Sequence, residues 1–196
     1  MKKLKIKMNG LSPILMNNPQ GVNPLNPLVL KKKALTGLPT KQRDTEENLI
    51  ACSDLDWEIG VYWDGNIGLY VPNECLIGTL VDGAKMGRNG ATIKKACHVC
   101  DSIVPLDIGE VQNYDKMLHD MRFRDVRSVV IKRARVKKTR PRFNTWRCEF
   151  TLLYDEALVD VPMIATAYEN AGKYCGIFDN RKNGYGRYTT SITELD

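Results

Sequence analysis

The chain has 196 residues, of which 43% are hydrophobic and 27% are charged, with a formal net charge of +6. This composition is typical of one large globular domain and argues against a disordered or collagen-like chain. No apolar run reaches the roughly 20 residues needed to span a bilayer, so we expect no membrane partner.

The first part of the chain predicts a strand, a loop and a helix. Residues 2–8 alternate lysines with apolar side chains, the pattern of a strand with one cationic and one apolar face. No apolar stretch follows this basic start, so we expect no secretory leader. Prolines and asparagines throughout residues 12–27 predict an extended loop, and residues 28–35 predict a short basic helix.

The next segments predict a helix followed by a hairpin. Residues 45–55 are expected to be helical, because Asp44 and Glu47 form a capping pair at their start. Residues 57–63 and 67–71 alternate as strands around an Asp64–Gly65 turn.

The middle of the chain holds one strong helix signal. Residues 73–86 carry apolar side chains at helical spacing behind Pro72. We expect residues 88–96 to be flexible, 97–106 to form a strand or an irregular crossing, and a short helix over 111–118.

The last third predicts strands on either side of a helix. Residues 128–138 are rich in β-branched side chains, 139–144 predict a turn at Pro141, and 145–154 alternate as a strand. A capped helix over 160–172, ending at Gly172, precedes a last strand at 187–192.

These elements predict an α+β fold with a ferredoxin-like, or RRM-like, βαββαβ core. Residues 1–196 would form a single RRM-like domain with an antiparallel sheet, both helices on one face and the other face open. Large insertions would follow the first strand and the first helix, at about 10–71 and 87–121. The core elements are expected at 2–8, 73–86, 127–138, 145–154, 160–172 and 186–192.

Positive charge is concentrated in residues 122–147, which hold eleven Lys/Arg and one acid, Asp125. The aromatic side chains Phe123, Phe143 and Trp146 lie among these cations. Cations for phosphates and rings for bases are what a surface for single-stranded nucleic acid requires. A solvated hairpin, an acidic protein partner or another phosphate ligand are the alternatives.

A second basic segment lies near the C-terminus, where Gly184 and Gly186 flank Tyr185. Glycines allow backbone amides to approach a phosphate closely, and Arg181, Lys182 and Arg187 would supply charge. A tight turn that needs a positive φ explains the glycines equally well.

Three short segments resemble the RAMP superfamily, the RRM-like backbone and processing subunits of CRISPR effector complexes. Residues 4–15 (LKIKMNGLSPIL) resemble its first strand and turn, and residues 71–80 (VPNECLIGTL) resemble its first helix start. Residues 183–188 (NGYGRY) resemble its glycine-rich loop. The resemblance also fits related stand-alone phage proteins.

The resemblance implies subunits that bind guide RNA along a helical filament, using a palm and a thumb-like hairpin. Insertion 10–71 or the 122–147 hairpin would supply such a projection. It also implies a cytoplasmic location, in a bacterial or phage-infected host cell, and self-association as a filament or ring.

The cysteines and histidines offer weaker alternatives. Cys97 and Cys100 flank His98, but a second pair at zinc-site spacing does not occur, so we expect buried thiols and no metal or other cofactor. Six cysteines without a leader indicate free thiols in a reducing compartment. His119 is the candidate general base of a metal-independent RAMP-type RNA endonuclease, although an ordinary surface histidine explains it better.

We therefore expect a non-catalytic protein that binds single-stranded DNA or RNA with little sequence preference. The alternatives are the RNA endonuclease and a phage-encoded nucleotide sponge or anti-defence interaction protein. The expected binding residues are Lys132, Arg133, Arg135, Lys137, Lys138, Arg140, Arg142, Phe143, Arg181, Lys182, Gly184, Tyr185, Gly186 and Arg187.

Overall fold

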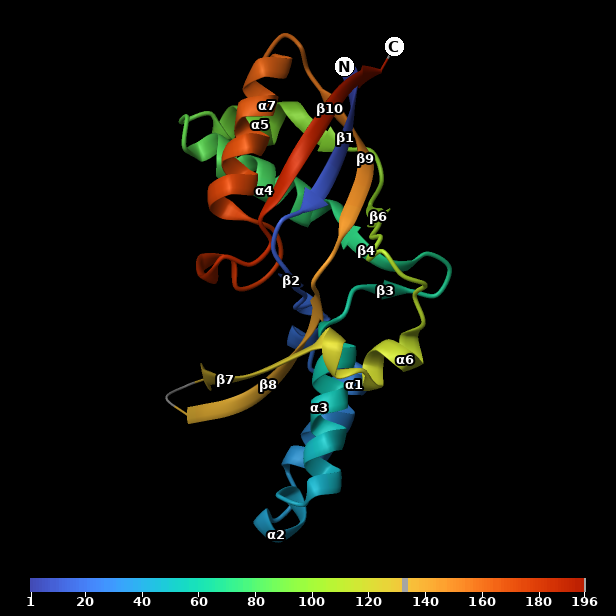
Figure 1. The fold of residues 1–196 in the computed structure, drawn as a ribbon. Coiled ribbons are helices and arrows are strands. Elements are labelled where there is room, and N and C mark those ends of the chain that lie inside the picture. The colour runs from blue at the N-terminus through green and yellow to red at the C-terminus, as the bar shows by residue number, and fades with distance from the viewer. Residues whose placement is uncertain (132–133, 196) are drawn as a thin grey trace. The chain divides into compact units, whose positions relative to one another are not determined.

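A computed structural model describes residues 1–131 and 134–195 (Figure 1). It contains helices and antiparallel sheets, which confirms the α+β class. The chain divides into two compact units. The sheet unit comprises Met1–Ile14, Trp63–Val111 and Phe143–Asp196, and the hairpin unit comprises Leu15–Tyr62 and Gln112–Arg142.

The sheet unit is built on a four-stranded antiparallel sheet in the order β10-β1-β9-β5. On β1 the side chains of Leu4, Ile6 and Met8 are fully buried, whereas the alternating lysines face the opposite side. The predicted two-faced strand is therefore confirmed. The strands are β1 (Lys2–Gly10), β5 (Cys97–Val99), β9 (Arg147–Tyr154) and β10 (Tyr188–Leu195).

Two helices of this unit pack against each other. Helix α4 (Asn73–Lys85) follows β4 and precedes β5, and helix α7 (Val161–Asn170) connects β9 to β10. The Asp160 side chain accepts a hydrogen bond from the Met163 amide (2.8 Å) and caps α7, as its position before Pro162 predicts. The buried stripe of α4 has the predicted helical spacing.

Shorter elements complete the sheet unit. A second sheet has the order β3-β4-β6 and contains the expected turn after Asp64. The elements are β3 (Trp63–Asp64), β4 (Gly68–Pro72), α5 (Gly90–Ala96), β6 (Ile103–Pro105), the π-helix η3 (Ala171–Cys175) and the 3-10 turn η4 (Arg181–Asn183).

The hairpin unit contains a three-stranded sheet in the order β2-β8-β7 and a helix pair, α1 and α3. Trp57 of α3 is fully buried, and its indole nitrogen donates to the Phe123 carbonyl (2.8 Å). The elements are β2 (Ile14–Leu15), η1 (Pro19–Val22), α1 (Pro27–Thr36), α2 (Thr40–Arg43), α3 (Glu46–Gly60), α6 (Tyr114–His119), η2 (Met121–Phe123), β7 (Arg124–Ile131) and β8 (Ala134–Phe143).

The predicted strand at 127–138 is wrong as part of the four-stranded sheet. This segment belongs to two strands, β7 and β8, which pair with each other and with β2. The short β5 takes the place beside β9. The predicted turn around Pro141 is also wrong, because Pro141 lies within β8 and its carbonyl accepts from the Met16 amide (2.9 Å).

Three further segments differ from expectation. Residues 57–60 continue α3, since a short apolar alternation also fits a helix whose buried positions lie three or four apart. Residues 90–96 form α5 because Ile93 and Ala96 bury one face of it. The last helix does not end at Gly172: it runs on as η3 and reverses at Gly176, where φ is +77°.

Candidate nucleic-acid interface

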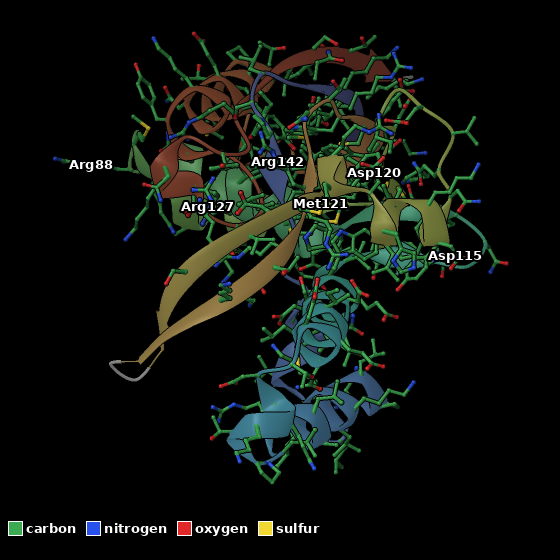
Figure 2. The ribbon with its side chains drawn as sticks, turned by 60° about the horizontal axis from the view of Figure 1, so that its bottom comes forward. Arg88, Asp115, Asp120, Met121, Arg127 and Arg142 are labelled. Carbon is green, nitrogen blue, oxygen red and sulfur yellow. The ribbon has the colours of Figure 1, made fainter. Side chains whose placement is uncertain are left out.

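The β7–β8 hairpin separates its side chains onto two faces. Directly paired residues share a face, so the register assigns each described side chain of the hairpin to one of two faces. Figure 2 shows the hairpin, with Arg127 and Arg142 labelled. One face carries the pairs Arg124–Pro141 and Val126–Thr139, and the other carries Asp125–Arg140 and Arg127–Lys138. We call the face with Arg124 and Thr139 the inner face, and the face with Lys138 and Arg140 the outer face.

The inner face packs on helix α3. The Thr139 hydroxyl lies 2.6 Å from that of Ser53, and Arg124 donates to Asp54 (2.6 Å), to Ser53 and to the Leu118 carbonyl. The Arg124 side chain is only 7% exposed. Its charge therefore holds the hairpin on α3 and is closed to an external phosphate.

The outer face carries a row of cations. Lys138, Arg140 and Arg142 occupy alternate positions of β8, and Arg127 lies opposite Lys138 on β7. Same-face residues on a strand are roughly 7 Å apart, so the three β8 side chains form a line. Asp125 is 6% exposed within this row and forms an ion pair with Arg127 (2.8 Å).

Several cations in residues 122–147 form ion pairs with carboxylates of the protein itself. The Arg122 hydrogen bond holds the pKa of Asp120 below its usual value, and the Gly109 amide, followed by the Arg147 side chain, does the same for Asp107. Among the described residues, ion pairs join Arg122 to Asp120, Arg124 to Asp54, Arg127 to Asp125 and Arg147 to Asp107.

The predicted hairpin residues have different settings. Lys137 is exposed, and Lys138 is half-buried with its ammonium donating to Asn17 Oδ1 (2.9 Å). Arg140 and Arg142 are also half-buried. Arg135 lies in β8, whereas Lys132 and Arg133 lie outside the described residues.

Phe143 is wrong as a stacking residue because its ring is only 1% exposed. Burial of a phenylalanine ring stabilises a fold by roughly 1.5–3 kcal/mol, which favours the core over a solvent-facing position. Trp146 is equally buried, and its indole nitrogen donates to the Ser12 carbonyl (2.9 Å).

The glycine-rich loop of the sheet unit is held against the turn after β1. The Gly186 amide donates to the Pro13 carbonyl (2.8 Å), and the Arg187 amide donates to the Ser12 hydroxyl (2.9 Å). That hydroxyl donates in turn to the Gly184 carbonyl (2.7 Å). A Cβ on Gly186, at φ +71°, would lie 2.1 Å from the Ile177 carbonyl. The positive φ and the close approach to Ile177 in this turn therefore explain why residue 186 is a glycine.

An ion pair also anchors the loop to α4. Arg181 donates to Asp82 (2.8 Å), and Arg187 donates to the Arg181 carbonyl (3.3 Å). Burial alone would raise the pKa of Asp82, but hydrogen bonds from Lys85 and Arg181 outweigh it and lower the pKa. Lys182 is exposed, and Tyr185 is half-buried.

The three segments that resemble RAMP proteins meet within the sheet unit. The turn after β1 contacts the glycine-rich loop, as described, and Thr79 of α4 reaches the same region. The Thr79 hydroxyl bonds the Gly176 carbonyl and the Tyr188 hydroxyl, both at 2.9 Å. Hydrogen bonds between residues that lie 97 to 175 positions apart therefore join the three segments in one cluster.

The weaker candidates have ordinary surroundings. His119 is exposed at the end of α6. Cys97 is 1% exposed, and burial raises the pKa of its thiol to about 11, whereas Cys100 is exposed. Among residues 1–131 and 134–195, no three His, Cys, Asp or Glu side chains form a group that could hold a metal.

Sequence reasoning missed Arg127 and Asn17 as members of the outer face. Arg127 is the first residue of the expected strand at 127–138, and its partner across the hairpin depends on where the turn lies. A tract of basic and β-branched residues carries no turn residue that fixes this position.

In the described ranges, every helix is too short or too polar to cross a bilayer. Searches against protein-family models and curated proteins find no match to this chain.

Proposed function

We propose that this protein binds single-stranded nucleic acid, without catalysis, through the β7–β8 hairpin. The observation that supports this most is the outer face, where Lys138, Arg140 and Arg142 form a row on one strand. A line of cations suits the phosphates of an extended strand and carries no base-specific information. The protein should therefore bind single strands with little preference for their base sequence.

The inner face is consistent with this proposal because its contacts with α3 hold the hairpin in place. Contacts from Arg124 and Thr139 to α3 fix its base, so the outer cations lose little further freedom on binding. Lys137 is exposed, but its pairing with Ser128 places it on the inner face, so the proposed surface on the outer face does not include it. Lys132, Arg133 and Arg135 stay predictions.

The proposal includes a ferredoxin-like, RAMP-type core with the hairpin as part of an insertion in a single domain. The strand order β10-β1-β9-β5, with α4 after β1 and α7 between β9 and β10, supports a βαββαβ core. The hairpin would then act as the thumb-like projection. Copies of the protein would self-associate along the bound nucleic-acid strand. Lys182 and Tyr185 of the glycine-rich loop would add a second contact.

Two pairs of basic residues provide a matched test. Lys138→Gln/Arg142→Gln removes two charges from the outer face of the hairpin, whereas Lys94→Gln/Lys95→Gln removes two exposed charges from α5. Fluorescence anisotropy with a labelled single-stranded oligonucleotide would be measured across a salt series. If both hairpin residues contact phosphates, the hairpin variant should flatten the slope of log K against log salt by about 1.4.

The α5 variant should retain the wild-type slope, because its lysines lie on another element. Circular dichroism would check that both variants stay folded. Equal affinities for the wild type and the hairpin variant, or equal losses in both variants, would remove the hairpin from the binding surface.

A further inference from the structure

Strand β10 forms a long edge of the four-stranded sheet (Figure 1). It pairs with β1 over eight residues, from Tyr188 to Leu195. Within the described residues, no strand pairs with its other side. Every second residue of such an edge points its amide and carbonyl away from the sheet, ready to pair with another strand.

This edge lacks the features that usually protect an edge strand. Proteins blunt edges with short strands, charges or proline. The strand at the opposite edge, β5, is only three residues long, and β7 carries Arg124, Asp125 and Arg127. By contrast, β10 contains no proline, lysine or arginine, and its one charged residue, Glu194, lies near its end.

The side chains of β10 are also less covered than those of its neighbour. Ile192 lies opposite Ile6 and therefore points toward the helix side of the sheet. Ile6 is fully buried, whereas Ile192 remains half-buried. The apolar layer under the helices is thus incomplete at this edge, and another strand placed alongside β10 would extend it.

We propose that β10 pairs in antiparallel fashion with β10 of a second copy of this chain, centred on Ile192. A two-fold axis perpendicular to the sheet keeps the helices of both copies on the same side. Ile192 then meets Ile192 of the second copy, Ser191 faces Thr193, and Thr190 faces Glu194. The two Glu194 carboxylates lie at opposite ends, so no like charges meet.

The sequence of the strand favours a second copy over a charged peptide. Cross-strand hydroxyl pairs and a central isoleucine pair are compatible with self-pairing, and the edge offers no charged row for an acidic or basic segment. The inference names a surface for the proposed self-association but does not depend on nucleic acid. The closed dimer would be the repeating unit of any larger assembly.

The test introduces carboxylates that are attracted to lysines within one copy but repel each other between the two copies of the dimer. Ser191 and Thr193 are exposed, and they lie opposite Lys7 and Lys5 of β1. In Ser191→Glu/Thr193→Glu, the new carboxylates are attracted to these lysines within one copy. Across the two-fold axis each faces another carboxylate. Light scattering without nucleic acid should give twice 22.2 kDa for the wild type and 22.2 kDa for the variant.

A mixing experiment separates a specific pairing from general disruption. Ser191→Lys/Thr193→Lys should also be monomeric, since lysine then faces lysine across the axis. An equimolar mixture of the Glu and Lys variants should restore a dimer through opposite charges. A monomeric wild type, an unchanged mass in the Glu variant, or a mixture that stays monomeric would overturn the proposal. Each result is distinct from a loss of nucleic-acid binding in the hairpin variant.

Discussion

Two buried tyrosines of the sheet unit differ in whether their hydroxyl groups have a partner. Tyr168 is fully buried, and its hydroxyl has no hydrogen-bond partner among the described residues. The Tyr188 hydroxyl lies 2.9 Å from that of Thr79. Burial raises the pKa of both phenols, so both stay protonated and neutral at physiological pH.

Substitution by phenylalanine should therefore have opposite effects at the two positions. Tyr168→Phe removes an unsatisfied buried hydroxyl and should stabilise the protein by about 1 kcal/mol. Tyr188→Phe leaves Thr79 without this partner and should cost about 1 kcal/mol. Urea denaturation of both variants tests this, and a destabilised Tyr168→Phe would show that the hydroxyl is satisfied.

Whether a cation is available to a ligand also depends on the individual residue and its partners. The sequence predicted the basic segment correctly as a cluster of cations, but it could not show which cations are already paired. Asp54 is about 70 residues from Arg124, and Asp107 is 40 residues from Arg147. Ion pairs of this kind depend on the tertiary fold, so a local count of charges overstates what a ligand can reach.

At the scale of the element, close packing of α4 on α7 depends on Gly83. A Cβ at this position would lie 2.0 Å from the Ala167 carbonyl oxygen of α7. On the same helix, a Cβ at Gly78 would meet nothing within 4 Å. The two glycines thus have different roles, although both lie inside a helix.

Alanine at these two positions provides a matched pair. Gly83→Ala should cost more than about 2 kcal/mol, because two helix backbones must separate. Gly78→Ala should be neutral or stabilising by up to about 1 kcal/mol, because alanine favours a helix. Thermal denaturation measures both, and equal midpoints for the two variants would contradict the close approach.

The anchoring of the glycine-rich loop should depend on pH. The folded pKa of Asp82 lies below its usual value of 3.8, so its ion pair contributes to stability above that pH. The contribution is lost as the pH falls through the folded pKa. In NMR spectra, the Gly184 and Gly186 amide signals should therefore shift below about pH 3.8 in the wild type.

The Asp82→Asn variant should reproduce this release at neutral pH. Trypsin should then cleave after Arg181 or Lys182 faster than in the wild type. Glu74→Gln alters an exposed carboxylate on the same helix and serves as the control. An unchanged cleavage rate in Asp82→Asn would show that the ion pair does not hold the loop.

Elements with a clear period were predictable, whereas ambiguous ones were not. The alternation in β1 and β9 and the stripes of α4 and α7 each fit a single structure. The segment 57–60 fitted both a strand and a helix. For the β7–β8 hairpin the sequence predicts one strand and a turn, because Pro141 is a strong turn signal outside its tertiary context.

At the scale of the whole molecule, the division into two units accounts for the misplaced strand. Both units are made of segments that are discontinuous in sequence, and β8 and β9 follow each other directly but belong to different sheets. Patterns along the chain identify strands, but they do not identify the sheet that each strand joins. The sequence therefore predicts the cluster of cations, but not the β7–β8 hairpin that carries it, the sheet that it joins or its helix-packed face.

The central claim is that the hairpin binds single strands through their phosphates. The most direct measurement is the affinity of the wild-type protein for matched single-stranded and duplex oligonucleotides across a salt series. If about five phosphates are contacted, log K for the single strand should fall with log salt with a slope of about −3.5, and the single strand should bind more tightly than the duplex. Affinity that does not change with salt, or a preference for the duplex at every salt concentration, would contradict the account.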